Sequence, residues 1–174
     1  RAAVLGLLAS PVALLTGGPG VGKTTIVRWI ADLAAAAGYE IKLASPTGRA
    51  AKRLSQATGR PASTIHRLLK HQPPDGFEHD ATNPLEAGIV LVDEISMLDV
   101  VLAHHLINAI AAPTRLILVG DPDQLPSVGA GNVLADLLTS GVIPTHRLTQ
   151  IYRQDEQSLI VENAHRVLAG EMPY

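Results

Sequence analysis

A glycine-rich run that ends in lysine and threonine carries the most specific chemistry in the sequence. Residues 17–24 read GGPGVGKT and match the phosphate-binding pattern GxxxxGK[ST]. The glycines let backbone N–H groups turn inward around a phosphate, and a helix that begins there adds its positive end. Lys23 could reach the β and γ phosphates of a nucleotide, and the Thr24 hydroxyl could bind Mg²⁺. Such a P-loop predicts nucleotide contacts from Gly18, Pro19, Gly20, Val21, Gly22, Lys23, Thr24 and Thr25.

Two carboxylates follow an apolar run at residues 89–92. Asp93, at the predicted end of a strand, could hold Mg²⁺ through the water shell of the metal. Glu94 could then accept a proton from an attacking water molecule. The alternative is an acidic pair that caps the following helix.

A polar loop, GDPDQLPS at residues 120–127, follows a second apolar run at 116–119. In this loop Gln124 could hydrogen-bond the γ-phosphate or the attacking water without bringing a charge. Because glycine and the Asp-Pro pair favour turns, an ordinary connection between a strand and a helix is the alternative.

The elements that must position these residues alternate between strands and helices. Short apolar runs, mostly without alternation, predict strands covered on both faces. They lie at residues 12–16, 41–44, 89–92 and 116–119, with a weaker candidate at 147–149. Helical patterns lie at 2–8, 23–37, 48–57, 64–69, 100–111, 132–138 and 156–169. This alternation predicts an α/β fold with a parallel sheet, helices on both faces, and ligands beyond the carboxyl ends of the strands.

Composition narrows the class of protein further. The 174 residues are 47% hydrophobic and 17% charged, so a disordered chain is excluded. The absence of cysteine excludes a disulfide framework and a cysteine zinc site. Residues 2–22 carry no charge, but Ser10-Pro11 and the glycines of the P-loop interrupt any continuous apolar helix. We therefore expect no membrane span.

The net charge of −2 combines two segments of opposite sign. Residues 49–70 carry six Lys or Arg and no acid, whereas residues 75–99 carry seven acids and no Lys or Arg. The basic segment could follow the backbone of a nucleic acid, although Arg60 and Lys70 could equally be solvated helix charges. Residues 71–88 predict a long surface loop, in which Phe77 could stack on a base or anchor the loop.

Taken in order, the motifs resemble those of the RecD-type helicases of superfamily 1B, the exonuclease V alpha-subunit family. The matching segments are GGPGVGKTT at 17–25, SPTGRAAKRL at 45–54, STIHRLL at 63–69, VDEISMLD at 92–99, VGDPDQLPSVGAG at 119–131 and LTQIYRQ at 148–154. The resemblance covers essentially the whole chain, and TraI-like and Dda-like helicases are more distant alternatives. It implies a RecA-like P-loop NTPase fold that binds ATP and Mg²⁺. It also implies movement from 5′ to 3′ on single-stranded DNA, for recombination or repair in the bacterial cytoplasm.

The resemblance implies roles for individual residues as well. It gives catalytic positions at Lys23, Glu94, Gln124 and Arg153 and Mg²⁺ ligands at Thr24 and Asp93. Arg153 matches an arginine that reaches the γ-phosphate, which suits a rigid guanidinium donor. The residues that match the family's contacts to single-stranded DNA are Pro46, Thr47, Gly48, Arg49, Thr64, His66 and Arg67. His66 could instead be a buried, hydrogen-bonded histidine.

Both ends of the chain depart from the family pattern. The glutamine that reads adenine in the family would precede Arg1, and motifs V and VI of a second RecA-like domain are absent. We therefore expect residues 1–174 to form a single RecA-like ATPase domain of a longer protein, which could associate with nuclease or helicase subunits. Without the arginine finger of a second domain, this chain is expected to bind Mg-ATP weakly and to hydrolyse it very slowly.

Two other functions stay open on the residues alone. A P-loop kinase acting on a small molecule would explain Lys23, Thr24 and an acidic residue, but neither the Gln124 loop nor the basic segment. A nucleotide-dependent interaction module without motor activity would retain the fold. The intact pair Asp93-Glu94 and Gln124 argue against a domain that has lost motor activity.

Overall fold

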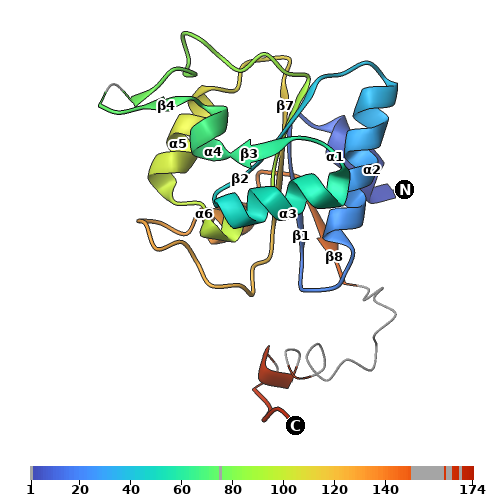
Figure 1. The fold of residues 1–174 in the computed structure, drawn as a ribbon. Helices are drawn as coiled ribbons and strands as arrows, with labels where there is room; N and C mark the ends of the chain where they lie inside the picture. Colours follow the sequence, from blue (N-terminus) through green and yellow to red (C-terminus); the bar gives the residue numbers. More distant parts are fainter. Residues whose placement is uncertain (1, 75, 150–162, 164–165, 169) are drawn as a thin grey trace.

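A six-stranded parallel sheet forms the centre of the molecule (Figure 1). The computed structural model describes residues 2–74, 76–149, 163, 166–168 and 170–174. The strands follow the order β3-β2-β6-β7-β1-β8 across the sheet. Their bounds are Val12–Gly17 (β1), Ile41–Ser45 (β2), Ala62–Thr64 (β3), Ile89–Val92 (β6), Arg115–Gly120 (β7) and Thr145–Leu148 (β8). The predicted α/β fold with a parallel sheet is confirmed.

Helices cover both faces of this sheet. One face carries α1 (Ala2–Ala9), α2 (Lys23–Ala36) and α3 (Gly48–Thr58), and the other carries α4 (Ile65–Leu68), the 3-10 helix η1 (Ile95–Met97), α5 (Val100–Asn108) and α6 (Val133–Ser140). β6 divides between the two apolar clusters, since Ile89 and Leu91 belong to one and Val90 and Val92 to the other. All four residues are buried, which explains why this strand is a continuous apolar run.

The packing of α2 fixes the position of the P-loop that precedes it. Val27, Ile30 and Ala34 are buried in the cluster that also contains β1. The helix ends close to the predicted residue, because Gly38 has a φ of 77° and its N–H donates to the carbonyl of Ala35. None of the helices in the described part of the chain is long and apolar enough to cross a membrane.

Three parts of the chain differ from what the sequence predicted or lie beyond the described structure. The edge strand β3 was not predicted, because three half-buried residues give too short a pattern. Residues 71–88 are not a loop throughout, since β4 (His71–Gln72) and β5 (Gly76–Phe77) form an antiparallel hairpin. Phe77 packs against the apolar cluster beneath α4 and α5, so it anchors this hairpin. Most of the helix predicted at 156–169 lies outside the described residues.

Candidate nucleotide-binding site

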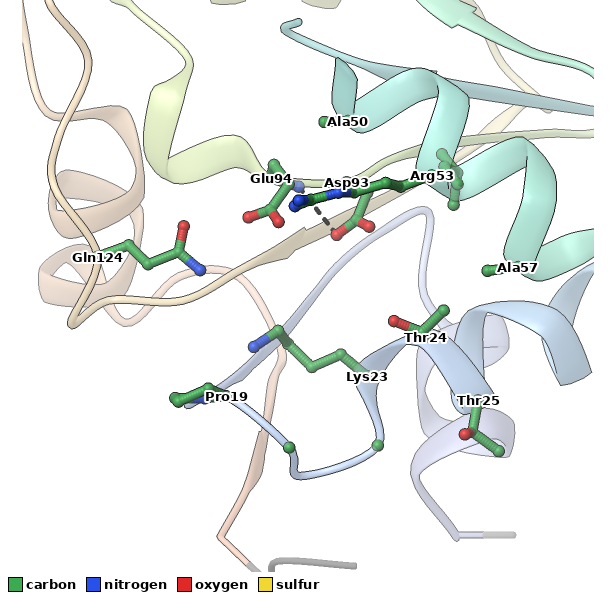
Figure 2. A pocket seen from close by; sticks show the side chains of 13 residues that line it. Pro19, Lys23, Thr24, Thr25, Ala50, Arg53, Ala57, Asp93, Glu94 and Gln124 are labelled. Carbon is green, nitrogen blue, oxygen red and sulfur yellow. Dashed lines mark hydrogen bonds between the residues drawn. The ribbon is translucent and has the colours of Figure 1, made fainter. Parts of the chain in front are cut away.

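A pocket of about 670 Å³ opens beyond the carboxyl ends of β1 and β6 (Figure 2). Its walls are the P-loop with the start of α2, one face of α3, the acidic end of β6 and the loop after β7. Because β6, β7 and β1 are neighbours in the sheet, polar residues that follow these strands converge there. The pocket brings together the predicted site residues Lys23, Thr24, Asp93, Glu94 and Gln124.

The backbone of the P-loop depends on glycine. Gly20 and Gly22 have φ values of 79° and 88°, in the left-handed region that a Cβ disfavours. Gly22 is the N-cap of α2 and provides no side-chain cap, so the first N–H groups of this helix remain available to an anion. The predicted contacts that line the pocket are Pro19, Gly20, Gly22, Lys23, Thr24 and Thr25. Gly18 and Val21 do not line it, and the Val21 side chain is buried.

Lys23 is held in place by its own loop. Its Nζ donates to the carbonyl of Gly18 at 2.8 Å and to the carbonyl of Gly17. The same atom lies 3.7 Å from Oδ2 of Asp121. With only 15% of its side chain exposed, the ammonium is positioned at the P-loop in a low-dielectric setting, where its attraction to a phosphate is stronger than in water.

Asp93 is largely removed from solvent at the end of β6. Its Oδ1 accepts a hydrogen bond from the backbone N–H of Glu94 at 2.9 Å. Burial, reinforced by the neighbouring charge of Glu94, raises the pKa of Asp93 to about 6. The carboxylate therefore ionises reluctantly and would gain stability from a nearby cation.

Glu94 adopts a conformation that directs it into the pocket rather than into a helix cap. Its φ of 58° lies in the left-handed region, which is uncommon for a residue other than glycine and costs about 1–2 kcal/mol. Glu94 precedes η1 without forming a side-chain cap, and Asp99 caps α5 instead by accepting from the N–H of Leu102 at 2.8 Å. The buried Oε2 of Glu94 has no hydrogen-bond partner among the described residues. The helix-cap alternative is therefore wrong for this pair of acids.

Asp121 connects the loop after β7 to the P-loop. It is 1% exposed, and its Oδ1 accepts from the N–H of Asp123 at 3.1 Å. Its Oδ2 lies 3.4 Å from Nε2 of Gln124 and 3.7 Å from Nζ of Lys23. A single buried carboxylate thus orients both the lysine and the glutamine that face the pocket.

Residues 1–173 match the AAA_30 family, described as an AAA domain. The chain belongs to this family. It is also 46% identical over 174 residues to the ATP-dependent RecD2 DNA helicase of Deinococcus radiodurans, covering 99% of this chain and 24% of that protein. It is 44% identical over 163 residues to the RecBCD enzyme subunit RecD of Mycolicibacterium smegmatis, covering 79% of this chain and 29% of that protein. The AAA domain therefore spans about a quarter of the length of these relatives, and the predicted resemblance to RecD-type helicases is confirmed.

A solved structure confirms the fold. The Pif1 helicase from Candida albicans superposes with a TM-score of 0.67 at 23% identity, covering 99% of this chain and 44% of that chain. The predicted RecA-like P-loop NTPase fold is therefore correct for this AAA domain.

The sequence alone did not identify two charged residues: Arg53, which lines the pocket, and Asp121, which lies behind the lining and contacts Lys23 and Gln124. Asp121 directly follows a buried strand beside β1 and β6, and this position was the signal that could have identified it. Arg53 was counted with the basic segment, although it lines the nucleotide pocket. Its spacing from Ala50 and Ala57, which also line the pocket, places all three on one face of α3.

Three of the residues predicted to bind DNA meet in a second hollow. A groove of about 370 Å³ between α3 and the β3–α4 segment is lined by Gly48, Thr64 and Arg67 together with Lys52. The Thr64 hydroxyl accepts from the N–H of Arg67 at 3.2 Å and caps α4. Thr47 caps α3 in the same way, accepting from the N–H of Ala50 at 3.3 Å. Both hydroxyls keep their own proton for a further acceptor.

Four of the residues predicted to bind DNA are not part of the groove lining, namely Pro46, Thr47, Arg49 and His66. His66 is exposed, so the buried-histidine alternative is wrong. No cluster of three or more potential metal ligands occurs in the part of the chain that the structure describes. Arg153 lies outside the described residues.

Proposed function

We propose that this chain is the ATP-binding motor domain of a RecD-type DNA helicase. Hydrolysis of ATP drives its parent protein from 5′ to 3′ along single-stranded DNA during recombination or repair. The observation that carries the proposal is the convergence of Lys23, Thr24, Asp93, Glu94 and Gln124 in one pocket. The names of the relatives, which are bacterial DNA helicases and RecBCD subunits, support the same assignment.

The pocket has the donors that a nucleotide and its metal require. Lys23 and the free N–H groups at the start of α2 bind the phosphates. The Thr24 hydroxyl and the Asp93 carboxylate would hold Mg²⁺, which prefers hard oxygen ligands. The fit is supported by the raised pKa of Asp93, since a cation favours the ionised carboxylate that burial disfavours. When bound, Mg²⁺ neutralises charge on the phosphates.

The carboxylate beyond Asp93 and the loop after β7 then act on water. Glu94 accepts a proton from the attacking water through its unpartnered Oε2. Gln124, oriented by Asp121, hydrogen-bonds this water or the γ-phosphate. Arg153 is proposed to reach the γ-phosphate from the same domain.

Single-stranded DNA is proposed to bind across the N-terminal end of α3 and the β3–α4 segment. The contacts come from Pro46, Thr47, Gly48, Arg49, Thr64, His66 and Arg67. The groove beside α3 supports this proposal, because Lys52 and Arg67 line it and neither takes part in an ion pair among the described residues. Such cations bind phosphate without reading sequence. The solved structure of a Bacteroides Pif1 bound to single-stranded DNA shares this fold, with a TM-score of 0.63 at 20% identity.

We also propose that residues 1–174 form one motor domain and that the full-length protein adds a second. The second domain would close over the nucleotide and supply an arginine finger, worth about 10³–10⁵ in kcat in P-loop NTPases. Because two relatives are named RecBCD enzyme subunits, nuclease or helicase subunits are the proposed protein partners.

The decisive experiment compares ATP hydrolysis by the full-length protein with and without single-stranded DNA. Strong stimulation is expected, and Lys23→Ala should abolish it. Absence of stimulation, together with phosphoryl transfer to a small molecule, would establish the P-loop kinase alternative instead. Nucleotide binding without turnover would establish the interaction module.

A further inference from the structure

Arg53 lies in the nucleotide pocket but has no role in the function proposed above. It extends from α3 into the pocket, on the wall opposite the P-loop residues Lys23 and Thr24 (Figure 2). Its guanidinium takes part in none of the ion pairs among the described residues. An exposed guanidinium with no ion pair in the described part of the chain is therefore directed into this pocket.

The two faces of α3 serve two different surfaces. Ala50, Arg53 and Ala57, spaced by three and four residues, line the nucleotide pocket. Lys52 and Ser55 line the groove on the other face of the helix. The neighbouring cations Lys52 and Arg53 therefore face different hollows, the groove and the nucleotide pocket.

We propose that Arg53 binds the terminal phosphate of the nucleotide and makes the pocket prefer ATP to ADP. This inference rests on the proposed function, which supplies ATP as the ligand. Arg53 lines the same pocket as Asp93 and Glu94, and in the view of Figure 2 its side chain runs from α3 in their direction. In the proposed function Glu94 activates water at this end, so the phosphate found here is the one that is attacked.

The charges around this end of the pocket explain why a second cation is needed. Asp93 and Glu94 together repel a terminal phosphate, and the single ammonium of Lys23 is shared with Asp121 and two backbone carbonyls. A guanidinium offers a planar fork of donors that matches two phosphate oxygens at once. The small side chains of Ala50 and Ala57 on the same face of α3 leave room for that approach.

The test is nucleotide binding to the full-length protein in Mg²⁺ and in the absence of DNA. Displacement of a fluorescent ADP gives the affinities for ADP and for a non-hydrolysable ATP analogue. Arg53→Ala is expected to weaken binding of the ATP analogue about tenfold and binding of ADP less than about twofold, because it removes a charge-assisted hydrogen bond to one phosphate. Arg53→Lys should restore part of the preference, and Arg28→Ala, at an exposed position of α2 outside both hollows, should leave both affinities unchanged.

An equal loss for the two nucleotides, or no loss, would overturn the role of Arg53. Thermal unfolding confirms that the variant is folded, and if Arg53→Ala fails to fold, Arg53→Gln provides the same comparison. Because the assay contains no DNA and needs no turnover, its failure leaves the helicase proposal standing. If DNA did not stimulate hydrolysis by the unmodified protein, the helicase proposal would be wrong. The ratio of the two nucleotide affinities would still test the role of Arg53.

Discussion

The two hollows on either side of α3 are built in opposite ways. At the nucleotide pocket the half-buried Lys23 is paired with the buried Asp121 behind the pocket wall. In the groove Lys52 and Arg67 are exposed and free of ion pairs among the described residues. Buried charges act through geometry in a low dielectric, whereas exposed cations act through their number and are screened by salt. Substitutions in the pocket should therefore change chemistry, and substitutions in the groove should change salt-dependent affinity.

The largest effect is expected at Glu94. Glu94→Gln removes the proton acceptor but keeps the shape, so kcat for ATP in the full-length protein should fall by about 10²–10⁴. ATP binding should stay within about twofold in a filter or fluorescence assay, since binding is assigned to other residues. The exposed Glu86→Gln is the control. Full turnover in Glu94→Gln would remove Glu94 from the role of general base.

Asp93 should make stability depend on pH. Its pKa of about 6 in the folded state exceeds the ordinary value of 3.8, so its contribution to stability is fully present below about pH 4 and is lost as pH rises through 6. Since one pKa unit corresponds to about 1.4 kcal/mol, Asp93→Asn should raise the free energy of unfolding on the order of 2–3 kcal/mol above pH 7.

Urea unfolding at pH 4 and pH 7.5, without Mg²⁺, provides the measurement for Asp93. The variant and the unmodified protein should be similar at pH 4 and differ at pH 7.5. Adding Mg-ATP should raise the free energy of unfolding of the unmodified protein more than that of the variant, because ligand binding stabilises the folded state that binds it. An equal difference at both pH values would show that Asp93 ionises normally.

A smaller effect is expected at Asp121. Asp121→Asn removes the charge that orients Lys23 and Gln124, so kcat/KM for ATP should fall about tenfold. Steady-state hydrolysis measures this, and the exposed neighbour Asp123 provides the control variant Asp123→Asn. If the two variants behaved alike, the orienting role of Asp121 would be wrong.

The smallest effect is expected in the groove. Arg67→Ala should weaken binding of single-stranded DNA by a few-fold and reduce the slope of log affinity against log salt by about 1. Fluorescence anisotropy over a range of salt concentrations measures both, and Arg28→Ala, exposed on α2, is the control. A slope unchanged by Arg67→Ala would place the DNA elsewhere.

The same contrast explains what the sequence could predict. The P-loop and the acids after β6 were recognisable because each depends on short local patterns beside a buried strand. β3 gave no such pattern, being three residues at the sheet edge. Asp121 and Arg53 were not identified from the sequence, because their roles depend on neighbours that are distant in the chain.

Charge alone could not show which face of α3 a cation occupies. Lys52 and Arg53 belong to one basic segment in the sequence. They lie on different faces only because this segment folds as a helix. The fold places only some of the predicted DNA contacts in one groove, since the groove contains Gly48, Thr64 and Arg67 but not His66. The role of Arg153 stays a prediction, because that residue lies outside the described part of the chain.

The central claim is the proposed motor function, which requires the nucleotide in the pocket to change the affinity of the groove for single-stranded DNA; α3 lines both hollows and connects them. It is tested most directly by the affinity of the full-length protein for single-stranded DNA, measured by anisotropy with a non-hydrolysable ATP analogue and with ADP. We predict that the two affinities differ by about 5- to 150-fold, the usual range of coupling between two sites. Equal affinities in the two nucleotide states would contradict the account.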